Sequence, residues 1–107
     1  EIGDYVSVAV GTVLLTAVYG YEEGFRMCDG VPKEHVDTKY GKLVIENDVY
    51  IGANCTIMPN VRIGEGAIVG AGSFVNKDCD AWGIYVGSPA RKIAERPRLK
   101  KEIQDWK

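Results

Sequence analysis

Histidine and cysteine, the residues that most often bind metals or act as nucleophiles, are sparse in this chain of 107 residues. There is one histidine, His35, and there are three cysteines, Cys28, Cys55 and Cys79, which form no Cys-x-x-Cys pair. Zinc sites gather several such ligands at short spacings, so we expect no metal. We expect Cys55 and Cys79 to be buried, reduced thiols, which favours a cytoplasmic location.

The elements that must position any site follow a six-residue repeat over 45–80. An aliphatic residue opens every block, at Ile45, Ile51, Ile57, Ile63, Val69 and Val75. The fifth position of every block is small or medium-sized, at Val49, Cys55, Val61, Ala67, Ser73 and Cys79. This period fits neither an amphipathic helix nor an alternating strand and is typical of a β-solenoid. Three blocks make one turn of a three-sided solenoid, so we predict coils at 45–62 and 63–80.

The same period occurs at the start of the chain, where Ile2, Val8 and Leu14 predict a first coil over 2–19. It stops over 20–42 and then resumes in phase. A segment of this length without its own pattern is usually functional. We therefore expect an excursion loop from the solenoid, with a flexible insertion as the alternative.

After Asp80 the repeat decays, and Leu99, Ile103 and Trp106 lie on one face of a short helix predicted within Arg98–Lys107. We expect this helix to cover the open end of the last coil. The chain is thus predicted to be one domain, with a coil at 2–19, a loop at 20–42, coils at 43–87, and a tail and helix at 88–107. Three coils are only about 15 Å tall at the usual strand spacing, which is little core for a monomer, so we expect a homo-oligomer.

Composition excludes several partner classes. The formal charge of −2 gives no reason to expect nucleic acid or an anionic membrane as a partner. No stretch approaches the roughly 20 apolar residues of a membrane span. No signal-peptide pattern is visible either.

Four stretches resemble the hexapeptide-repeat acyltransferases, and most closely the maltose/galactoside type of sugar O-acetyltransferase. They are IGDYVSVAVGTVLLTA, GKLVIENDVYIGANCTIMPNVRIGEGAIVGAGS, VNKD and GSPARKI. The resemblance implies an all-β fold, a left-handed parallel β-helix. It also implies a homotrimer that binds acetyl-CoA between neighbouring subunits.

The catalytic position differs from the family pattern. Relatives carry a histidine base in a stretch like Thr-Ala-Thr-His-Pro, and the matching residue here is Tyr19. A tyrosine with a pKa near 10 is a poor base at neutral pH. Three hypotheses remain open: Tyr19 donates a hydrogen bond while the base is elsewhere, His35 acts as the base from the loop of this or a neighbouring subunit, or the chemistry is lost.

The cofactor side matches better. The resemblance implies that the backbone of one glycine-rich corner contacts the pantetheine arm, that the next corner faces CoA, and that a proline and two cations lie near its phosphates. These residues are, in that order, Gly70, Ala71 and Gly72; Asn76 and Lys77; and Pro89, Arg91 and Lys92. Arginine suits such a role because it can bind phosphate through two hydrogen bonds. On the acceptor side, Tyr50 occupies a position where relatives have an aromatic residue lining the cleft.

The sequence therefore predicts an acetyl-CoA-dependent O-acetyltransferase acting on a hydroxyl of a sugar or another small acceptor. The rival prediction is a catalytically silent scaffold or CoA-binding module, because Tyr19 replaces the family histidine.

Overall fold

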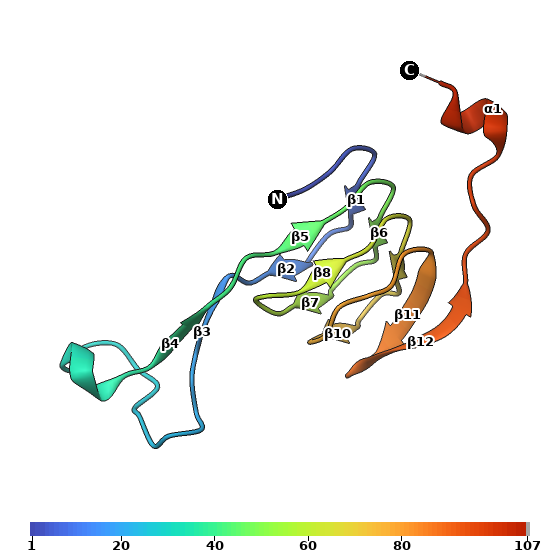
Figure 1. Ribbon diagram of the computed structural model, residues 1–107. Coiled ribbons are helices and arrows are strands. Elements are labelled where there is room, and N and C mark those ends of the chain that lie inside the picture. Colours follow the sequence, from blue (N-terminus) through green and yellow to red (C-terminus); the bar gives the residue numbers. More distant parts are fainter. Residues whose placement is uncertain (107) are drawn as a thin grey trace.

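The computed structural model describes residues 1–106 as a stack of parallel β coils with one projecting arm (Figure 1). Its principal extents are 57 × 28 × 22 Å. The coil strands are short: β1 (Ser7–Val8), β2 (Val13–Leu14), β5 (Val44–Ile45), β6 (Tyr50–Ile51), β7 (Thr56–Ile57), β8 (Arg62–Ile63), β9 (Ile68–Val69) and β10 (Phe74–Val75). No helix within residues 1–106 is long and apolar enough to cross a membrane.

Parallel pairing between successive coils builds the faces of the stack. Ile45 pairs with Ile63, Ile51 with Val69 and Ile57 with Val75, each eighteen positions later. The first coil joins in the predicted phase, because β1 pairs with β6 and β2 pairs with β7. The six aliphatic residues that open the blocks are at most 1% exposed and form the core. The predicted β-solenoid is confirmed.

The corners explain the fourth position of the first five blocks. Asp48, Asn54, Asn60, Gly66 and Gly72 all have positive φ. Asparagine, aspartate and glycine are the residues that adopt this left-handed conformation at least cost. The repeat thus specifies its corners as well as its core.

The last coil is shorter than predicted. Ile63 pairs with Cys79, sixteen positions later, so Cys79 takes the place of the aliphatic residue that opens a block instead of the predicted fifth position. The corner before it is tightened, with Asp78 Oδ1 accepting a hydrogen bond from the Arg62 amide at 2.8 Å. Cys79 is 4% exposed, so its predicted burial is correct although its register is not.

The excursion forms an arm rather than an irregular loop. β3 (Ala17–Tyr19) and β4 (Thr38–Tyr40) pair antiparallel, and a 3-10 turn, η1 (Lys33–His35), lies farther out. The arm extends away from the coils (Figure 1). The arm starts three residues earlier than the predicted loop. The sequence did not reveal this, because strands of three residues are too short to show an alternating pattern.

The C-terminal segment also differs from the prediction. β11 (Gly83–Gly87) and β12 (Ala90–Glu95) form an antiparallel hairpin, and β11 continues the sheet of β1, β6 and β9. The helix α1 spans only Lys101–Gln104 and does not cover the end of the last coil. Instead the tail runs back across the corners, where Trp106 packs on Tyr5 of the first coil at a centroid distance of 6.1 Å. Lys107, the last residue of the predicted helix, lies outside the described residues.

Arg96 fastens this tail to the solenoid. Its Nη1 donates hydrogen bonds to the carbonyl oxygens of Asp48 at 2.8 Å and of Gly66 at 3.0 Å, which belong to successive coils. Its guanidinium also lies over the buried ring of Trp82, 5.4 Å from the centroid. The prediction that the tail is held by the aliphatic face of a helix is therefore wrong.

Candidate functional site

Two of the predicted cofactor motifs meet around one hollow at the end of the last coil. The hollow measures about 180 Å³ and takes Asn76 and Lys77 from the corner after β10, and Arg91 and Lys92 from β12. Ala90, the exposed Asp78 and the buried Val75, Cys79 and Tyr85 complete its wall. Pro89 lies one residue outside it, exposed in the turn between β11 and β12.

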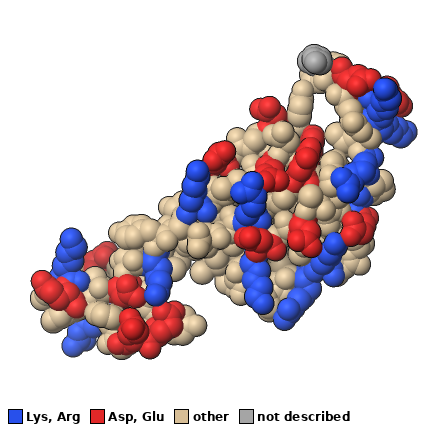
Figure 2. All heavy atoms as spheres, viewed as in Figure 1, with Lys and Arg blue, Asp and Glu red and all other residues tan. Residues whose placement is uncertain are grey.

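The two cations that β12 contributes to this hollow differ in their surroundings. Lys92 Nζ lies 2.6 Å from Glu95 Oε1 and 3.9 Å from Asp80 Oδ2, and the hydrogen bond to Glu95 raises the pKa of Lys92. Arg91 is exposed and forms no ion pair among residues 1–106. Figure 2 shows that cations and carboxylates are interleaved over the coils, so no broad basic face exists in that view. Arg91 is the freer of the two to receive an anion.

The glycine-rich corner lies at the other end of β10. The amide of Gly70 donates to Tyr85 O at 2.8 Å and that of Gly72 donates to Ala53 O at 2.8 Å. A Cβ on Gly70 would lie 2.5 Å from Val86 Cγ1, so the close approach of β11 requires glycine there. Both amides are thus used within the solenoid. Of the three residues, Ala71 alone donates no backbone hydrogen bond within the described chain.

Tyr19, at the predicted catalytic position, is paired with an acidic residue of the arm. Its hydroxyl donates a hydrogen bond to Asp29 Oδ1 at 2.5 Å. This hydrogen bond, with smaller contributions from desolvation and nearby charge, raises the pKa of Tyr19. Tyr19 is therefore a hydrogen-bond donor and not a base at neutral pH.

His35 does not join this pair. It lies exposed in η1, where its backbone oxygen accepts a hydrogen bond from the Arg26 amide at 2.6 Å. No side-chain hydrogen bond involving His35 is found among the described residues. Within one subunit, the structure does not support His35 as a base acting beside Tyr19.

Tyr50 also lies apart from the arm. It is 45% exposed on β6, in register with Ser7 of β1 and Ile68 of β9. The structure therefore brings Asn76, Lys77, Arg91 and Lys92 together and pairs Tyr19 with Asp29. Tyr50 belongs to neither group and lies on β6, in the sheet that ends in β12.

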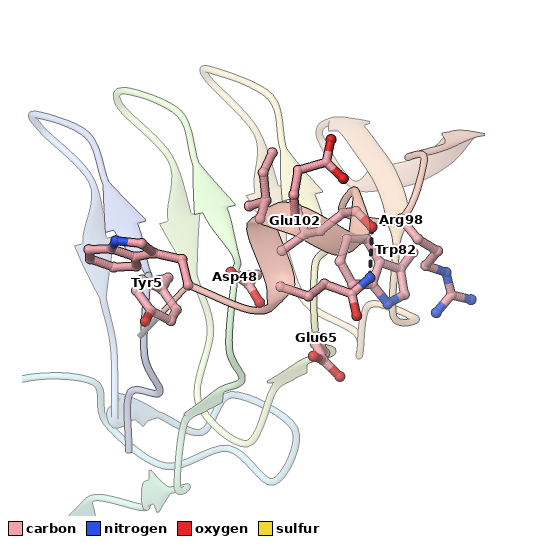
Figure 3. A pocket seen from close by; sticks show the side chains of 10 residues that line it. Tyr5, Asp48, Glu65, Trp82, Arg98 and Glu102 are labelled. Carbon is pink, nitrogen blue, oxygen red and sulfur yellow. Dashed lines mark hydrogen bonds between the residues drawn. The ribbon is translucent and has the colours of Figure 1, made fainter.

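A larger hollow lies elsewhere. It measures about 770 Å³ and lies between the tail and the corners of the solenoid (Figure 3). Its wall includes the rings of Tyr5, Trp82 and Trp106 and none of the residues predicted to bind cofactor or acceptor. The tail contacts the coils here through Trp106 on Tyr5 and Arg98 on Trp82.

Comparison with known protein families identifies the repeat of this chain. Residues 42–77 match the family described as bacterial transferase hexapeptide (six repeats). Over this segment the chain carries the hexapeptide repeat of that transferase family. The matched segment contains the blocks that build the core and both corners around β10.

Relatives in this family include sugar-modifying enzymes. The chain is 31% identical over 103 residues to the dTDP-4-amino-4,6-dideoxy-D-glucose acyltransferase of Escherichia coli, covering 96% of this chain and 54% of that protein. A solved variant of AntD, an N-acyltransferase from Bacillus cereus, superposes with a TM-score of 0.88 at 38% identity, over 97% of this chain and 55% of AntD. That structure holds dTDP-4-amino-4,6-dideoxyglucose and coenzyme A.

A galactoside acetyltransferase in complex with coenzyme A superposes with a TM-score of 0.74 at 30% identity, over 88% of this chain and 44% of its own. The chain thus spans about half the length of the proteins it matches. The resemblance to hexapeptide-repeat acyltransferases, including the galactoside type, is confirmed.

Asp29 is the site residue that the sequence did not reveal. It is one of 15 acidic residues in the chain and belongs to no motif, so only its bond to Tyr19 distinguishes it.

Proposed function

We propose that this chain binds an acyl-CoA and transfers the acyl group to a sugar-type acceptor, as a trimer of left-handed solenoids. The observation that carries the proposal is the hollow where Asn76 and Lys77 meet Arg91 and Lys92. These residues come from two motifs far apart in the sequence, and both motifs were assigned to CoA by resemblance.

Solved relatives support the ligand. AntD and the galactoside acetyltransferase were both solved with coenzyme A. In this chain the exposed Arg91 supplies a guanidinium for a phosphate, and Asn76 and Lys77 supply short-range donors beside it.

The acceptor side supports an assembly of several subunits. The arm that carries Tyr19 lines no part of the hollow formed by Arg91 and Lys92. A complete site therefore needs the arm of one subunit near the hollow of another. Light scattering tests this: a trimer of the 11.7-kDa chain is expected at about 35 kDa, and a monomer would contradict an inter-subunit site.

Turnover tests the activity itself. Thiol release from acetyl-CoA is measured with two acceptors, dTDP-4-amino-4,6-dideoxyglucose and its counterpart with a hydroxyl at C4, dTDP-6-deoxyglucose. Acceptor-dependent thiol release with either compound supports a transferase. CoA binding without release across a broad panel of sugars would favour the second candidate, a catalytically silent CoA-binding scaffold, which the tyrosine at position 19 supports.

A further inference from the structure

We propose that the tail hollow, the space of about 770 Å³ between the tail and the corners of the solenoid, binds a quaternary ammonium group. The rings of Tyr5 and Trp106 and the carboxylate of Asp48 would hold it. The tail hollow shares no lining residue with the hollow proposed for CoA. The inference therefore goes beyond the proposed function and does not depend on it.

The coils build the floor of the tail hollow as a column of equivalent corners. Tyr5, Asp48 and Trp82 each take the fourth position of a block and have positive φ, as does Gly66 between the last two. Backbone hydrogen bonds of 2.8–2.9 Å join each corner to the next. Successive corners are about 4.8 Å apart, the usual spacing of paired strands. The side chains of Tyr5, Asp48 and Trp82 therefore lie in one row (Figure 3).

At one end of this row, an aromatic ring already holds cations of the chain itself. A Cβ on Gly66 would collide with the Trp82 ring, so glycine lets the indole lie against the corner, where Trp82 is buried. The guanidinium groups of Arg96 and Arg98 lie over this ring, 5.4 Å and 5.1 Å from its centroid. The Trp82 end of the tail hollow is thus occupied.

The opposite end has aromatic surface without a cation. The rings of Tyr5 and Trp106 lie 6.1 Å apart between centroids, with their planes inclined at 56°. The two residues are 64% and 68% exposed. Among residues 1–106, no lysine or arginine lies over either ring. Because the face of an aromatic ring attracts cations within about 6 Å, this pair of rings can receive a cation from solvent.

The charge of the tail hollow favours a cation. Its lining contains three carboxylates, those of Asp48, Glu65 and Glu102, and one guanidinium, that of Arg98, so its net charge is −2. None of the three carboxylates forms an ion pair within the described part of the chain. Asp48 lies one corner away from Tyr5 in the row. A cation beside the two rings is therefore attracted by an unpaired carboxylate as well.

The spacing of the carboxylates favours a large cation over a metal ion. A metal ion needs several ligand atoms that converge on one point. Among the described residues, no three histidine, cysteine, aspartate or glutamate side chains form a group that could hold one. A quaternary ammonium group needs no such convergence, because its methyl groups pack on ring faces and its charge is spread over them. The arrangement of rings and carboxylates thus fits an organic cation.

Choline and its neutral counterpart, 3,3-dimethylbutan-1-ol, test the inference. In the neutral compound a carbon atom replaces the nitrogen, so the two probes differ only in charge. Ligand-observed NMR of the methyl protons follows their binding to the native protein at constant ionic strength. We expect choline to bind with a dissociation constant on the order of 1 mM. The neutral compound should bind about tenfold more weakly or worse.

Two substitutions examine the two parts of the site. Asp48→Asn removes the charge and keeps the size, and asparagine tolerates the positive φ of this corner. It should weaken choline binding about threefold or more while leaving the neutral compound unaffected. Trp106→Ala should weaken choline binding about fivefold or more, and Trp106→Phe, which keeps a ring, should restore most of it.

Matched controls remove the same groups from the arm. Glu23→Gln and Tyr21→Ala, the latter at a side chain that is 75% exposed, should leave choline binding unchanged. Equal binding of the two probes, no choline binding at ten times the expected dissociation constant, or unaltered binding in Asp48→Asn would overturn the inference. Saturating choline should change the affinity for CoA less than twofold. A larger change would contradict the placement of choline in the tail hollow.

Discussion

The hydroxyl of Tyr19 donates a hydrogen bond to Asp29 Oδ1 at 2.5 Å, joining the root of the arm to a residue ten positions later. By resemblance to the sugar O-acetyltransferases, Tyr19 was predicted to take the place of a histidine base. A phenol held in this way keeps its proton at neutral pH, since ionisation would place a phenolate beside a carboxylate. The position predicted to be catalytic therefore holds a fixed hydrogen-bond donor.

This pair predicts the titration of Tyr19. The pKa of Tyr19 is raised, chiefly by its hydrogen bond to Asp29, so its phenolate should form above pH 10. Asp29→Asn should bring the pKa back towards the ordinary value. Ultraviolet difference titration of each protein against its Tyr19→Phe counterpart isolates this one tyrosine. An unchanged midpoint in Asp29→Asn would show that the hydrogen bond is absent in solution.

Burial in the core predicts that two truncations of aliphatic side chains differ greatly in their effect on the free energy of unfolding. Ile57 is 0% exposed and pairs with Leu14 and Val75 on either side, so Ile57→Ala should lower the free energy of unfolding by about 2–5 kcal/mol. Val10 is 83% exposed, and Val10→Ala should cost less than about 0.5 kcal/mol. Urea denaturation at one fixed chain concentration measures both. Similar losses would contradict the assigned repeat register.

The cysteines predict a reactivity pattern. Burial, with smaller contributions from Asp78 and Asp80, raises the pKa of Cys79 to about 12, so at pH 8 only about one molecule in 10⁴ carries the reactive thiolate. Cys55 is 1% exposed, whereas Cys28 is exposed on the arm. A disulfide reagent should modify one thiol per native chain and three after denaturation. In Cys28→Ser, rapid labelling of the native protein should vanish, and its persistence would refute the burial of the other two.

Arg96 predicts the stability of the tail attachment. Arg96→Ala removes two hydrogen bonds to the carbonyl oxygens of Asp48 and Gly66, and should destabilise the fold by about 2 kcal/mol. Arg98 lies over the same Trp82 ring at 5.1 Å but makes no such bonds among the described residues, so Arg98→Ala is the matched control and should cost under about 1 kcal/mol. Hydrogen exchange of residues 97–106 should quicken in Arg96→Ala only.

The sequence predicts the solenoid well because every block repeats the same physical demand. Ile51 and Val69 must fill the core at one position, and Asn54 and Gly72 must turn the corner at another. The prediction fails where a single interaction replaces the repeat. Cys79 shifts by two positions because the corner at Asp78 is tightened, which no spacing of hydrophobic residues records.

In the candidate site, too, some residues could be predicted from the sequence and one could not. Arg91 and Lys92 belong to a motif with a recognisable context, and the structure places them beside Asn76 and Lys77. Asp29 lies outside any strand and contacts Tyr19 of β3, and an isolated loop aspartate gives no pattern to detect. Hydrogen bonds between distant segments are set by the folded path of the arm and become visible only with it.

Calorimetric titration of the native oligomer with CoA, for the wild type, Arg91→Ala and Lys92→Ala, tests the central proposal most directly. We predict binding in the micromolar to submillimolar range. Arg91→Ala should weaken it about tenfold to a hundredfold, consistent with loss of a charge-assisted phosphate contact of roughly 1.5–3 kcal/mol. Lys92→Ala should weaken it less, because Glu95 and Asp80 already hold that ammonium. Absence of heat at millimolar CoA would contradict the assignment of this fold to an acyl-CoA transferase.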